Sequence, residues 1–385
     1  MKRLKVFVGG FRRCRSMKRR KNSFIKVLFI FLILFVGGCY PVQKNFSPDP
    51  ELKSSRRADN PMPLDQDGVM LGLYPSGSLR YAVGEIRHFD TWIENTGTKV
   101  SLAGTYMDLE ASDPERVVPA EMEAAWGSGY LPFVKLMVGH VHVGRTAQDI
   151  AEGKVDDSLR AWARAYARWS QEGKKRAFIV PLPEMNGGWV SYGKDPDAFI
   201  KAFRHIREIF HQEGVSSESA AWVFAPNGWG EEGHEFERYY PGDDVVDVIG
   251  FSSYNSGHCS DWPQWEGYEQ IYRPYLDRMV SMAPEKPIFI AEMGTVDQGG
   301  DKNAWLMDTI AQLSEYPGVE AILYFNRKVT SAAMTNCNQK ADHRIFDDQV
   351  RLGFPGVLDA LSSSNFAYYP PDSPYLDVLW MPSRK

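Results

Sequence analysis

Short apolar runs recur along the chain from residue 69 onward, and a longer stretch with helically spaced apolar positions follows each of them. Several runs are apolar almost throughout, which is typical of parallel strands that are covered on both faces. The runs predict eight strands, at residues 69–74, 101–109, 130–138, 177–184, 220–227, 245–254, 287–294 and 319–326.

The stretches between the runs predict amphipathic helices, most clearly at residues 157–173, 196–213, 264–283 and 302–316. Gly214 supplies a stop signal at the end of the second of these. Successive strands end about 36 residues apart, a spacing that suits βα units. We therefore predict an α/β fold, a single (β/α)8 TIM barrel over residues 66–362. A doubly wound open sheet is the alternative, although no strand is followed by a GxGxxG or P-loop pattern.

The first 38 residues differ from the rest of the chain. They hold 11 Lys and Arg and no acidic residue, and they end in the apolar run 27–38. That run is too short to span a bilayer, which takes about 20 residues, but it suits a signal peptide. Because Val36-Gly37-Gly38-Cys39 resembles a bacterial lipobox, we predict a lipoprotein signal over residues 1–38 and a lipid on Cys39. Met17 is an alternative start of translation. An uncleaved anchor is the alternative.

The remainder of the chain is acidic, with 33 basic against 49 acidic residues. This balance argues against nucleic acid as a partner. Residues 39–65 are polar and predict a linker, and residues 363–385 predict a C-terminal tail that packs under the barrel or stays mobile. We expect a monomer in the cell envelope, lipid-anchored to a membrane and facing the periplasm or the exterior. No His, Cys and acidic residues have metal-site spacing, so we expect no metal and no cofactor.

Two glutamates end predicted strands. Glu184 closes the fourth run, within IVPLPEMNGGW, and Glu292 closes the seventh, within PIFIAEMGT. In a (β/α)8 barrel the carboxyl ends of the strands form the active-site face. A carboxyl group that leaves a buried strand is costly unless it is paired or functional, so each glutamate is either a structural residue with a partner or a catalytic one.

Two carboxyl groups across a barrel mouth suit glycoside hydrolysis, in which one protonates the leaving oxygen. The second attacks the anomeric carbon when the groups lie about 5–5.5 Å apart, and it activates a water at about 6.5–9.5 Å. The first arrangement retains the anomeric configuration and the second inverts it.

The sequence around Glu184, PEMNGGWVSYG, resembles the acid/base signature of glycoside hydrolase family 26. Further similar phrases follow in the order of that family: WVFAPN, YYPGDDVVDVIGFSSYN, KPIFIAEMGT and EAILYFN. The resemblance implies a (β/α)8 barrel and a retaining endo-β-glycanase that acts on a polysaccharide. The substrate it implies first is β-1,4-mannan, and mixed-linkage β-glucan and β-xylan are alternatives. It also implies that Glu184 is the acid/base and Glu292 the nucleophile.

The same resemblance implies substrate-binding residues. Tyr254 would hydrogen-bond the nucleophile, Trp189 would offer a ring face to a sugar, and the others are His140, Asn186, Asn227 and Asn326. Each also has a structural interpretation. Tyr254 would be an ordinary tyrosine of the barrel rim, Trp189 would pack in a loop, His140 would have structural hydrogen bonds, and the asparagines would cap loops. Pro183 stands where the family has a histidine before the acid/base.

Cys259 and Cys337 follow the sixth and eighth strands, so both fall in loops at the catalytic rim. In an exported protein these loops could be joined by a disulfide, and two free thiols are the alternative.

Two other functions fit the same residues. In the first, the protein is a hydrolase that trims the exopolysaccharide of its own host. In the second, it is a glycan-binding lipoprotein without catalytic activity.

Overall fold

The computed structural model describes residues 68–75, 77–138, 144–229, 233–260, 264–330, 335–337 and 340–380. The predicted signal peptide, the lipidation residue Cys39, the linker up to residue 65 and His140 lie outside these residues. No helix among the described residues has the length and apolar character needed to cross a membrane.

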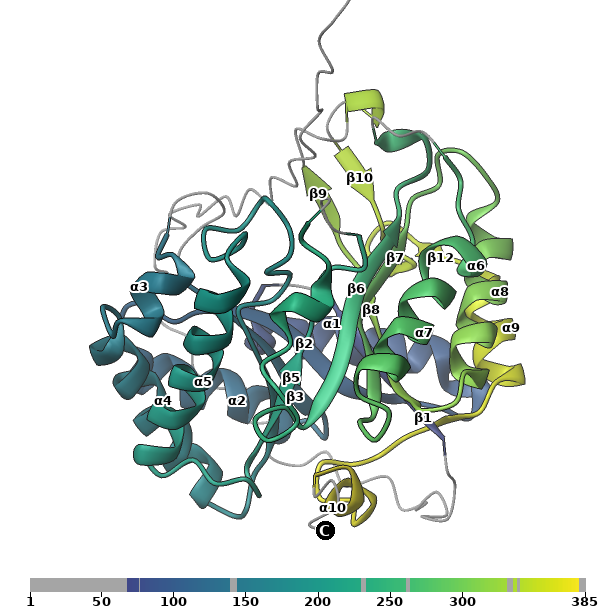
Figure 1. Ribbon diagram of the computed structural model, residues 1–385. Coiled ribbons are helices and arrows are strands. Elements are labelled where there is room, and N and C mark those ends of the chain that lie inside the picture. The colour runs from purple at the N-terminus through teal and green to yellow at the C-terminus, as the bar shows by residue number, and fades with distance from the viewer. Residues whose placement is uncertain are drawn as a thin grey trace, which may run out of the picture.

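Eight parallel strands form a closed barrel, which confirms the (β/α)8 prediction and excludes the open sheet (Figure 1). The strands pair in chain order, and β8 pairs with β1 to close the ring. Their bounds agree closely with the apolar runs: β1 (Val69–Tyr74), β2 (Val100–Asp108), β3 (Leu131–Met137), β4 (Ala177–Pro181), β5 (Ala220–Phe224), β6 (Val248–Asn255), β7 (Ile288–Thr295) and β8 (Val319–Phe325).

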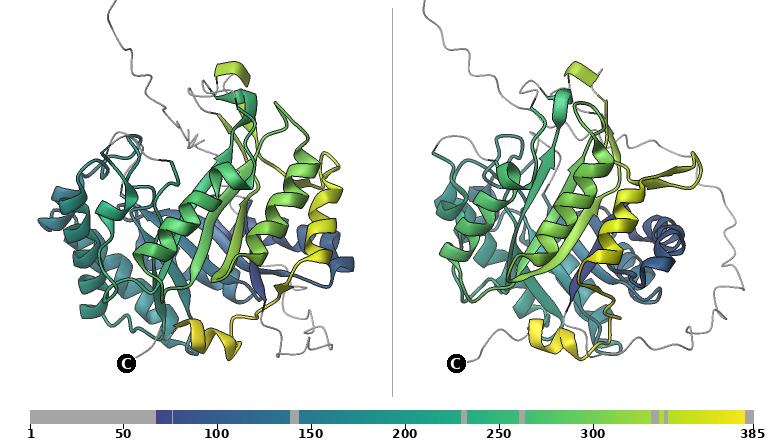
Figure 2. Two further views of the ribbon diagram at one scale, coloured as in Figure 1. Left: turned by 45° about the vertical axis from the view of Figure 1, so that its right-hand side comes forward. Right: turned by 90° about the vertical axis from the view of Figure 1, so that its right-hand side faces the viewer.

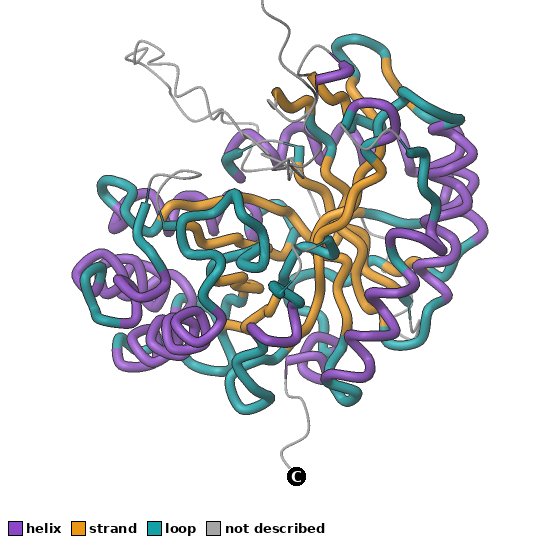
Figure 3. The backbone as a smooth tube through the Cα atoms, turned by 45° about the horizontal axis from the view of Figure 1, so that its top comes forward, coloured by secondary structure: helices purple, strands orange, loops and turns teal. Residues whose placement is uncertain are grey.

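Helices form the outer layer around this barrel (Figure 3). Their bounds are α1 (Leu79–Ile93), α2 (Pro114–Trp126), α3 (Ala147–Ala151), α4 (Asp156–Gln171), α5 (Pro196–Gln212), α6 (Tyr268–Ile271), α7 (Arg273–Met282), α8 (Lys302–Glu315), α9 (Pro355–Ser363) and α10 (Tyr375–Trp380). Short 3₁₀ turns occupy η2 (Glu94–Thr96), η3 (Phe236–Tyr239), η4 (Gly257–Cys259) and η5 (Thr335–Cys337).

The predicted helix at 264–283 is two helices in the structure. Helix α6 ends at Ile271 and α7 begins at Arg273 with a proline in its first turn, Pro274. Proline has no backbone N–H to donate and favours the start of a helix, so the chain restarts there instead of continuing.

The apolar side chains divide between two cores. One lies inside the barrel and includes Phe133, Phe178 and Phe289, and the other lies between the strands and the outer helices. Inside the barrel, Gly104 makes room for Tyr74, because a Cβ at residue 104 would lie 2.5 Å from the tyrosine ring. The barrel is therefore a filled core, and the site has to be built on its upper end.

The C-terminal residues lie under the amino ends of the strands, where Figure 1 shows α10. Strand β13 (Phe366–Ala367) pairs with β1 in parallel, so residues beyond 362 extend the sheet. Tyr369 accepts a hydrogen bond from the backbone N–H of Gly68 (2.9 Å), and its ring stacks on Tyr375. This end of the molecule has the features of a structural base, as is usual for the lower face of such barrels.

Loops after β6 and β8 rise above the upper end of the barrel. The loop after β8 contains the hairpin β9 (Lys328–Thr330) and β10 (Lys340–Asp342), and the small ribbon of β11 (Phe346–Asp347) and β12 (Leu352–Gly353) follows. Figure 2 shows the hairpin standing above α8 and α9, which lie side by side.

A disulfide between Cys259 and Cys337 joins η4 to η5 and so ties these two loops together. It closes a loop of 78 residues in sequence. We expect Cys259→Ser with Cys337→Ser to lower the free energy of unfolding by about 2–4 kcal/mol, because the unfolded chain regains the entropy of that loop. Thermal unfolding without reductant measures the loss. The two proteins should unfold alike in excess reductant, and a gap that persists there would show that the effect comes from the serines.

Candidate active site

Glu292 enters the site from β7 because of an irregularity in that strand. Next to β6 the register runs from Ile290 opposite Phe251 to Glu292 opposite Ser252, so Ala291 is an extra residue. Such a bulge changes the face to which the following side chains point. Ala291 belongs to the core inside the barrel, and the bulge turns Glu292 to the inside as well.

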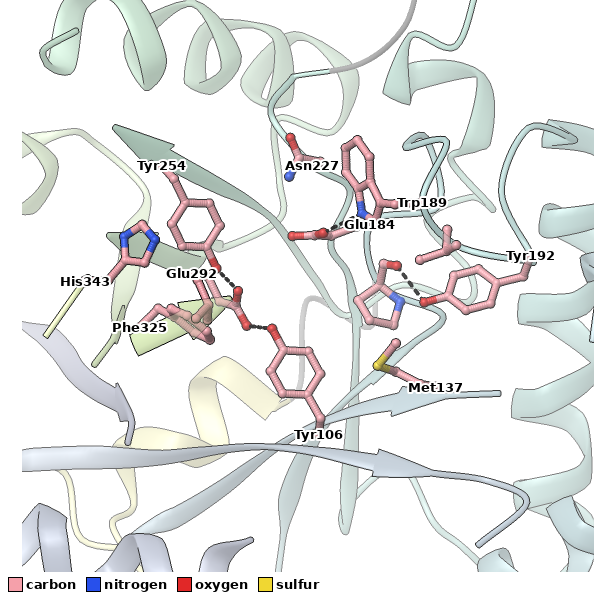
Figure 4. A pocket seen from close by; sticks show the side chains of 13 residues that line it. Tyr106, Met137, Glu184, Trp189, Tyr192, Asn227, Tyr254, Glu292, Phe325 and His343 are labelled. Atoms are coloured by element: carbon pink, nitrogen blue, oxygen red, sulfur yellow. Dashed lines mark hydrogen bonds between the residues drawn. The ribbon is translucent and has the colours of Figure 1, made fainter. Parts of the chain in front are cut away.

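Three donors hold the Glu292 carboxylate, which is only 1% exposed. The phenol of Tyr106 on β2 donates to Oε1, and the phenol of Tyr254 on β6 donates to Oε2 (Figure 4). Nζ of Lys135, on β3, lies 2.9 Å from Oε1. The cation and the two hydroxyl donors thus reach both oxygens of this buried side chain.

The two phenols stay protonated in this setting. Burial, followed by the negative charge of Glu292, raises the pKa of Tyr106 and of Tyr254 well above the ordinary range of tyrosine. Both therefore act as hydrogen-bond donors at any pH at which the barrel is folded.

Glu184 lies just past β4 in an unusual backbone conformation. Its φ is +57°, and Leu182, two residues before it, has φ of +52°, values that residues other than glycine seldom adopt. The Glu184 N–H donates to the carbonyl of Ala225 past β5 (2.9 Å), and its carbonyl accepts from Gly187 (2.9 Å). These bonds hold the strained turn, and strain of this kind collects at functional sites.

Two side chains orient the Glu184 carboxyl group. The indole Nε1 of Trp189 donates to Oε2 (2.9 Å), and Asn227 forms a second side-chain hydrogen bond. Gly187 leaves room for the indole, since a Cβ there would lie 2.3 Å from the Trp189 ring. The glycines of the MNGGW segment thus allow Trp189 to fold back on the acid.

The pKa of Glu184 is raised above the ordinary value of glutamate. Burial is the main cause, and the negative charge of Glu292 adds to it. The positive charge of Lys135, and then the hydrogen bonds from Trp189 and Asn227, oppose the rise. A carboxyl group with a raised pKa beside an ionised one is the pairing that separates an acid from a nucleophile.

The two carboxyl groups reach into one pocket from facing walls (Figure 4). Apolar and aromatic side chains form most of its lining: Met137, Pro183, Val190, Tyr192, Phe325 and Val329. His343 also faces the pocket. Burial, and then the charge of Lys302, lowers its pKa to about 3, so its imidazole is neutral at ordinary pH.

The predicted substrate-binding residues divide into two groups in the structure. Tyr254, Trp189 and Asn227 line the pocket and contact a glutamate. Asn186 instead bonds the backbone of Asn227, both as donor and as acceptor (2.8 Å each). Asn326 bonds the backbone of Ile345 and Phe346 in the same way. Both of these amides therefore connect loops, which was the structural alternative.

Sequence reasoning missed Tyr106, Lys135 and His343. Lys135 carried a usable signal, because it is the single charged residue in the run YLPFVKLMV, and a lysine inside a strand that is otherwise apolar needs a partner. Tyr106 and His343 carried none, since a tyrosine in a strand and a histidine in a loop are both ordinary.

We expect Trp189→Phe to move the basic limb of the kcat/KM profile to higher pH. In the wild type, the indole N–H stabilises the ionised form of Glu184. Without it the pKa of Glu184 rises further, and the carboxyl group keeps its proton to higher pH. kcat should fall by about 10-fold as the carboxyl group loses its fixed orientation. Trp229→Phe is the matched control, because Trp229 stacks on Trp189 with ring centroids 6.1 Å apart. Equal shifts in both variants would assign the effect to ring packing.

A closed barrel with two glutamates over one pocket, from β4 and β7, is an arrangement that suits glycoside hydrolysis by paired carboxyl groups. Within the described residues, no group of His, Cys, Asp and Glu could hold a metal ion.

The model of glycosyl hydrolase family 26 matches residues 146–316 of this chain. That segment contains both glutamates, Trp189 and Tyr254. In sequence the chain is 28% identical over 203 residues to Endoglucanase H of Acetivibrio thermocellus, which is 50% of this chain and 22% of that protein. It is 26% identical over 157 residues to Mannan endo-1,4-beta-mannosidase A and B of Caldalkalibacillus mannanilyticus, 38% of this chain and 27% of that protein. The chain thus spans about a quarter of the length of these relatives.

Solved structures share the fold. An endo-β-1,4-mannanase of Cellulomonas fimi aligns with a TM-score of 0.55 at 16% identity, over 78% of this chain and 72% of that one. A family 26 β-mannanase of Bacteroides ovatus aligns with a TM-score of 0.53 at 16% identity, over 84% and 95%. At this level of identity the likeness concerns the barrel alone.

Proposed function

We propose that the protein is a retaining endo-β-glycanase that hydrolyses a neutral polysaccharide, with β-1,4-mannan as the first candidate. The observation that carries the proposal is the unequal environment of two carboxyl groups in one pocket. Glu184 has a raised pKa and is the proton donor, while Glu292 is held by Lys135, Tyr106 and Tyr254 in the form that attacks carbon.

In the first step, an oxygen of Glu292 bonds to the anomeric carbon as the bond from that carbon to the leaving oxygen breaks. Glu184 gives its proton to the leaving oxygen, so the departing sugar leaves as a neutral alcohol. The product on the enzyme is a glycosyl ester of Glu292.

In the second step, the ionised Glu184 takes a proton from water, and the water oxygen bonds to the anomeric carbon. The ester bond breaks and its electron pair returns to Glu292. Two inversions at one carbon give net retention, and both carboxyl groups regain their starting forms.

The relatives supply the substrate candidates. One carries the name endoglucanase and another mannan endo-1,4-beta-mannosidase, and the second name describes cleavage of a β-1,4-linked mannan. The apolar lining of the pocket suits the faces of uncharged pyranose rings. Mixed-linkage β-glucan and β-xylan are the remaining substrate candidates. With each substrate, cleavage within the polysaccharide chain yields oligosaccharides.

A second candidate is trimming of an exopolysaccharide of the host. Pro183 lines the pocket at the place where the family resemblance has a histidine, so a contact to the sugar differs there. The predicted lipid on Cys39 would hold such an enzyme at the membrane, in the cell envelope, close to a polymer that is being exported.

Product analysis on a panel of β-mannan, xylan, mixed-linkage β-glucan and the host exopolysaccharide tests the proposal. Proton NMR during the first minutes of reaction should show oligosaccharides whose new reducing end has the β configuration. The α anomer as first product would contradict the double displacement. Cleavage of the host polymer alone would favour the second candidate over the first.

A further inference from the structure

Lys135 is a charged side chain without any solvent exposure inside the barrel. It belongs to β3, whose other inward residues, Leu131 and Phe133, are part of the inner apolar core. Moving an ammonium group into such surroundings costs several kcal/mol, and an apolar residue of similar volume often stabilises a core more than a buried ion pair does. Stability alone is therefore a poor reason for a lysine at this place.

The ammonium group is fixed from several strands. Nζ lies 2.9 Å from Oε1 of Glu292 on β7 and donates to Oγ of Ser252 on β6 (3.0 Å). It also lies 5.6 Å and 5.5 Å from the ring centroids of Tyr74 and Tyr106, on β1 and β2, within the range of cation–π attraction. Lys135 thus has one location, beside one particular oxygen of the nucleophile.

The donors are divided unequally between the two oxygens of Glu292. Oε1 has both Lys135 and Tyr106, whereas Oε2 has Tyr254. An oxygen that bonds to carbon gives up its negative charge and becomes a poor acceptor, while the other oxygen of the ester remains a carbonyl acceptor. The arrangement therefore suits an ester formed through Oε2, with Oε1 as its carbonyl oxygen.

We propose that Lys135 is a positioning residue. It keeps the negative charge of Glu292 on Oε1, directs Oε2 to the sugar and makes Glu292 a good leaving group in the second step. The proposal rests on the proposed function. When water attacks the anomeric carbon, the bond from that carbon to Oε2 breaks and its electron pair returns to the carboxylate. The positive charge beside Oε1 stabilises this developing negative charge inside a medium with little water.

The loss of Lys135 should move the basic limb of the pH profile to higher pH. Besides Lys135, the titratable groups around Glu292 are Tyr74, Tyr106, Tyr254 and Glu184. Burial, and next the charge of Glu292, raises the pKa of all three phenols far above their ordinary range, so they stay neutral. Burial raises the pKa of Glu184 and the charge of Lys135 opposes that rise. Without this charge, Glu184 keeps its proton to higher pH.

The experiment compares Lys135→Met with the wild type, on the polysaccharide for the pH profile of kcat/KM and on a β-glycoside whose aryl leaving group departs easily for kcat and KM. We expect the basic limb to move up by about 1 pH unit or more. We expect kcat to fall by about 10²-fold, together with KM, because the glycosyl ester accumulates when its breakdown slows. Rapid mixing should show a burst of aryl alcohol in the variant. Lys175→Met is the matched control, since it removes a lysine near the lower end of the barrel, paired there with Glu123.

The outcomes separate the two proposals. If Lys135→Met is less stable but keeps the wild-type basic limb, kcat and KM, Lys135 is only a structural counter-ion and the inference is overturned. Lys135→Gln, which keeps an N–H donor without the charge, answers the same question if the methionine variant does not fold. A wild-type protein that cleaves no polysaccharide and no aryl glycoside would overturn the proposed function, and this inference with it.

Discussion

Replacing Glu292 with glutamine is expected to lower kcat by at least about 10⁴-fold on every substrate that the wild type cleaves. The amide keeps the shape of the side chain but cannot bond to the anomeric carbon. The first step is therefore lost with every substrate, whether its leaving group is good or poor. The barrel should remain folded, because the amide oxygen can still accept from Lys135 and Tyr106, and the amide NH2 can donate to the phenol oxygen of Tyr254. Initial rates with the purified variant measure the loss of kcat, and circular dichroism shows whether the fold is kept.

Glu320→Gln is the matched control for that experiment. Glu320 lies near the start of β8, at the lower end of the barrel, and accepts a hydrogen bond from Tyr375 (2.7 Å). It should change activity little. A Glu292→Gln protein that keeps more than about a tenth of the wild-type kcat would show that another residue attacks the sugar.

Glu184→Gln should produce a loss that depends on the leaving group. Removal of a general acid costs about 10²–10⁴-fold in kcat/KM where the leaving oxygen needs a proton, as in a polysaccharide. An aryl glycoside with an acidic phenol needs no proton to depart, so its first step should be nearly unaffected. Its second step lacks the base and should be slow, so the glycosyl ester on Glu292 accumulates.

Azide distinguishes this loss from simple misfolding. Azide needs no deprotonation, and the neutral amide does not repel it as a carboxylate would, so azide should attack the ester, raise kcat of Glu184→Gln and leave the wild type unchanged. The product should be a β-glycosyl azide. Equal losses on the aryl glycoside and on the polysaccharide, with no response to azide, would contradict the role of Glu184 as acid and base.

Much of the barrel was predictable because its signals are local. Each apolar run from Val69 to Asn326 became a strand, since continuous apolar stretches bounded by turns have few other ways to be buried. The restart at Pro274 was missed because the apolar period continues across the proline. The pairing of Phe366 and Ala367 with β1 was not predicted either, because it joins two parts of the chain that lie almost 300 residues apart.

The active site was predictable where a side chain can be buried only at a high cost in free energy unless it has a partner or a function. Glu184 and Glu292 are carboxyl groups at the ends of apolar runs, and both line the pocket. Asn186 and Asn326 carried no such constraint, because an amide serves a loop as well as a sugar, and their roles depend on neighbours distant in sequence. The bulge that turns Glu292 inward arises from register between strands, which a single strand does not reveal.

The most direct test is to treat the wild-type protein with a 2-deoxy-2-fluoroglycosyl fluoride of the sugar it cleaves, and to locate the adduct by mass spectrometry of the digested protein. The fluorine at C2 slows both steps, while fluoride at the anomeric carbon is a good leaving group and keeps formation of the ester faster than its breakdown, so the intermediate collects. We predict one sugar per protein, bound to the peptide that contains Glu292, and no adduct in Glu292→Gln. An adduct on another residue, or full hydrolysis of substrate without any adduct, would contradict a covalent role for Glu292.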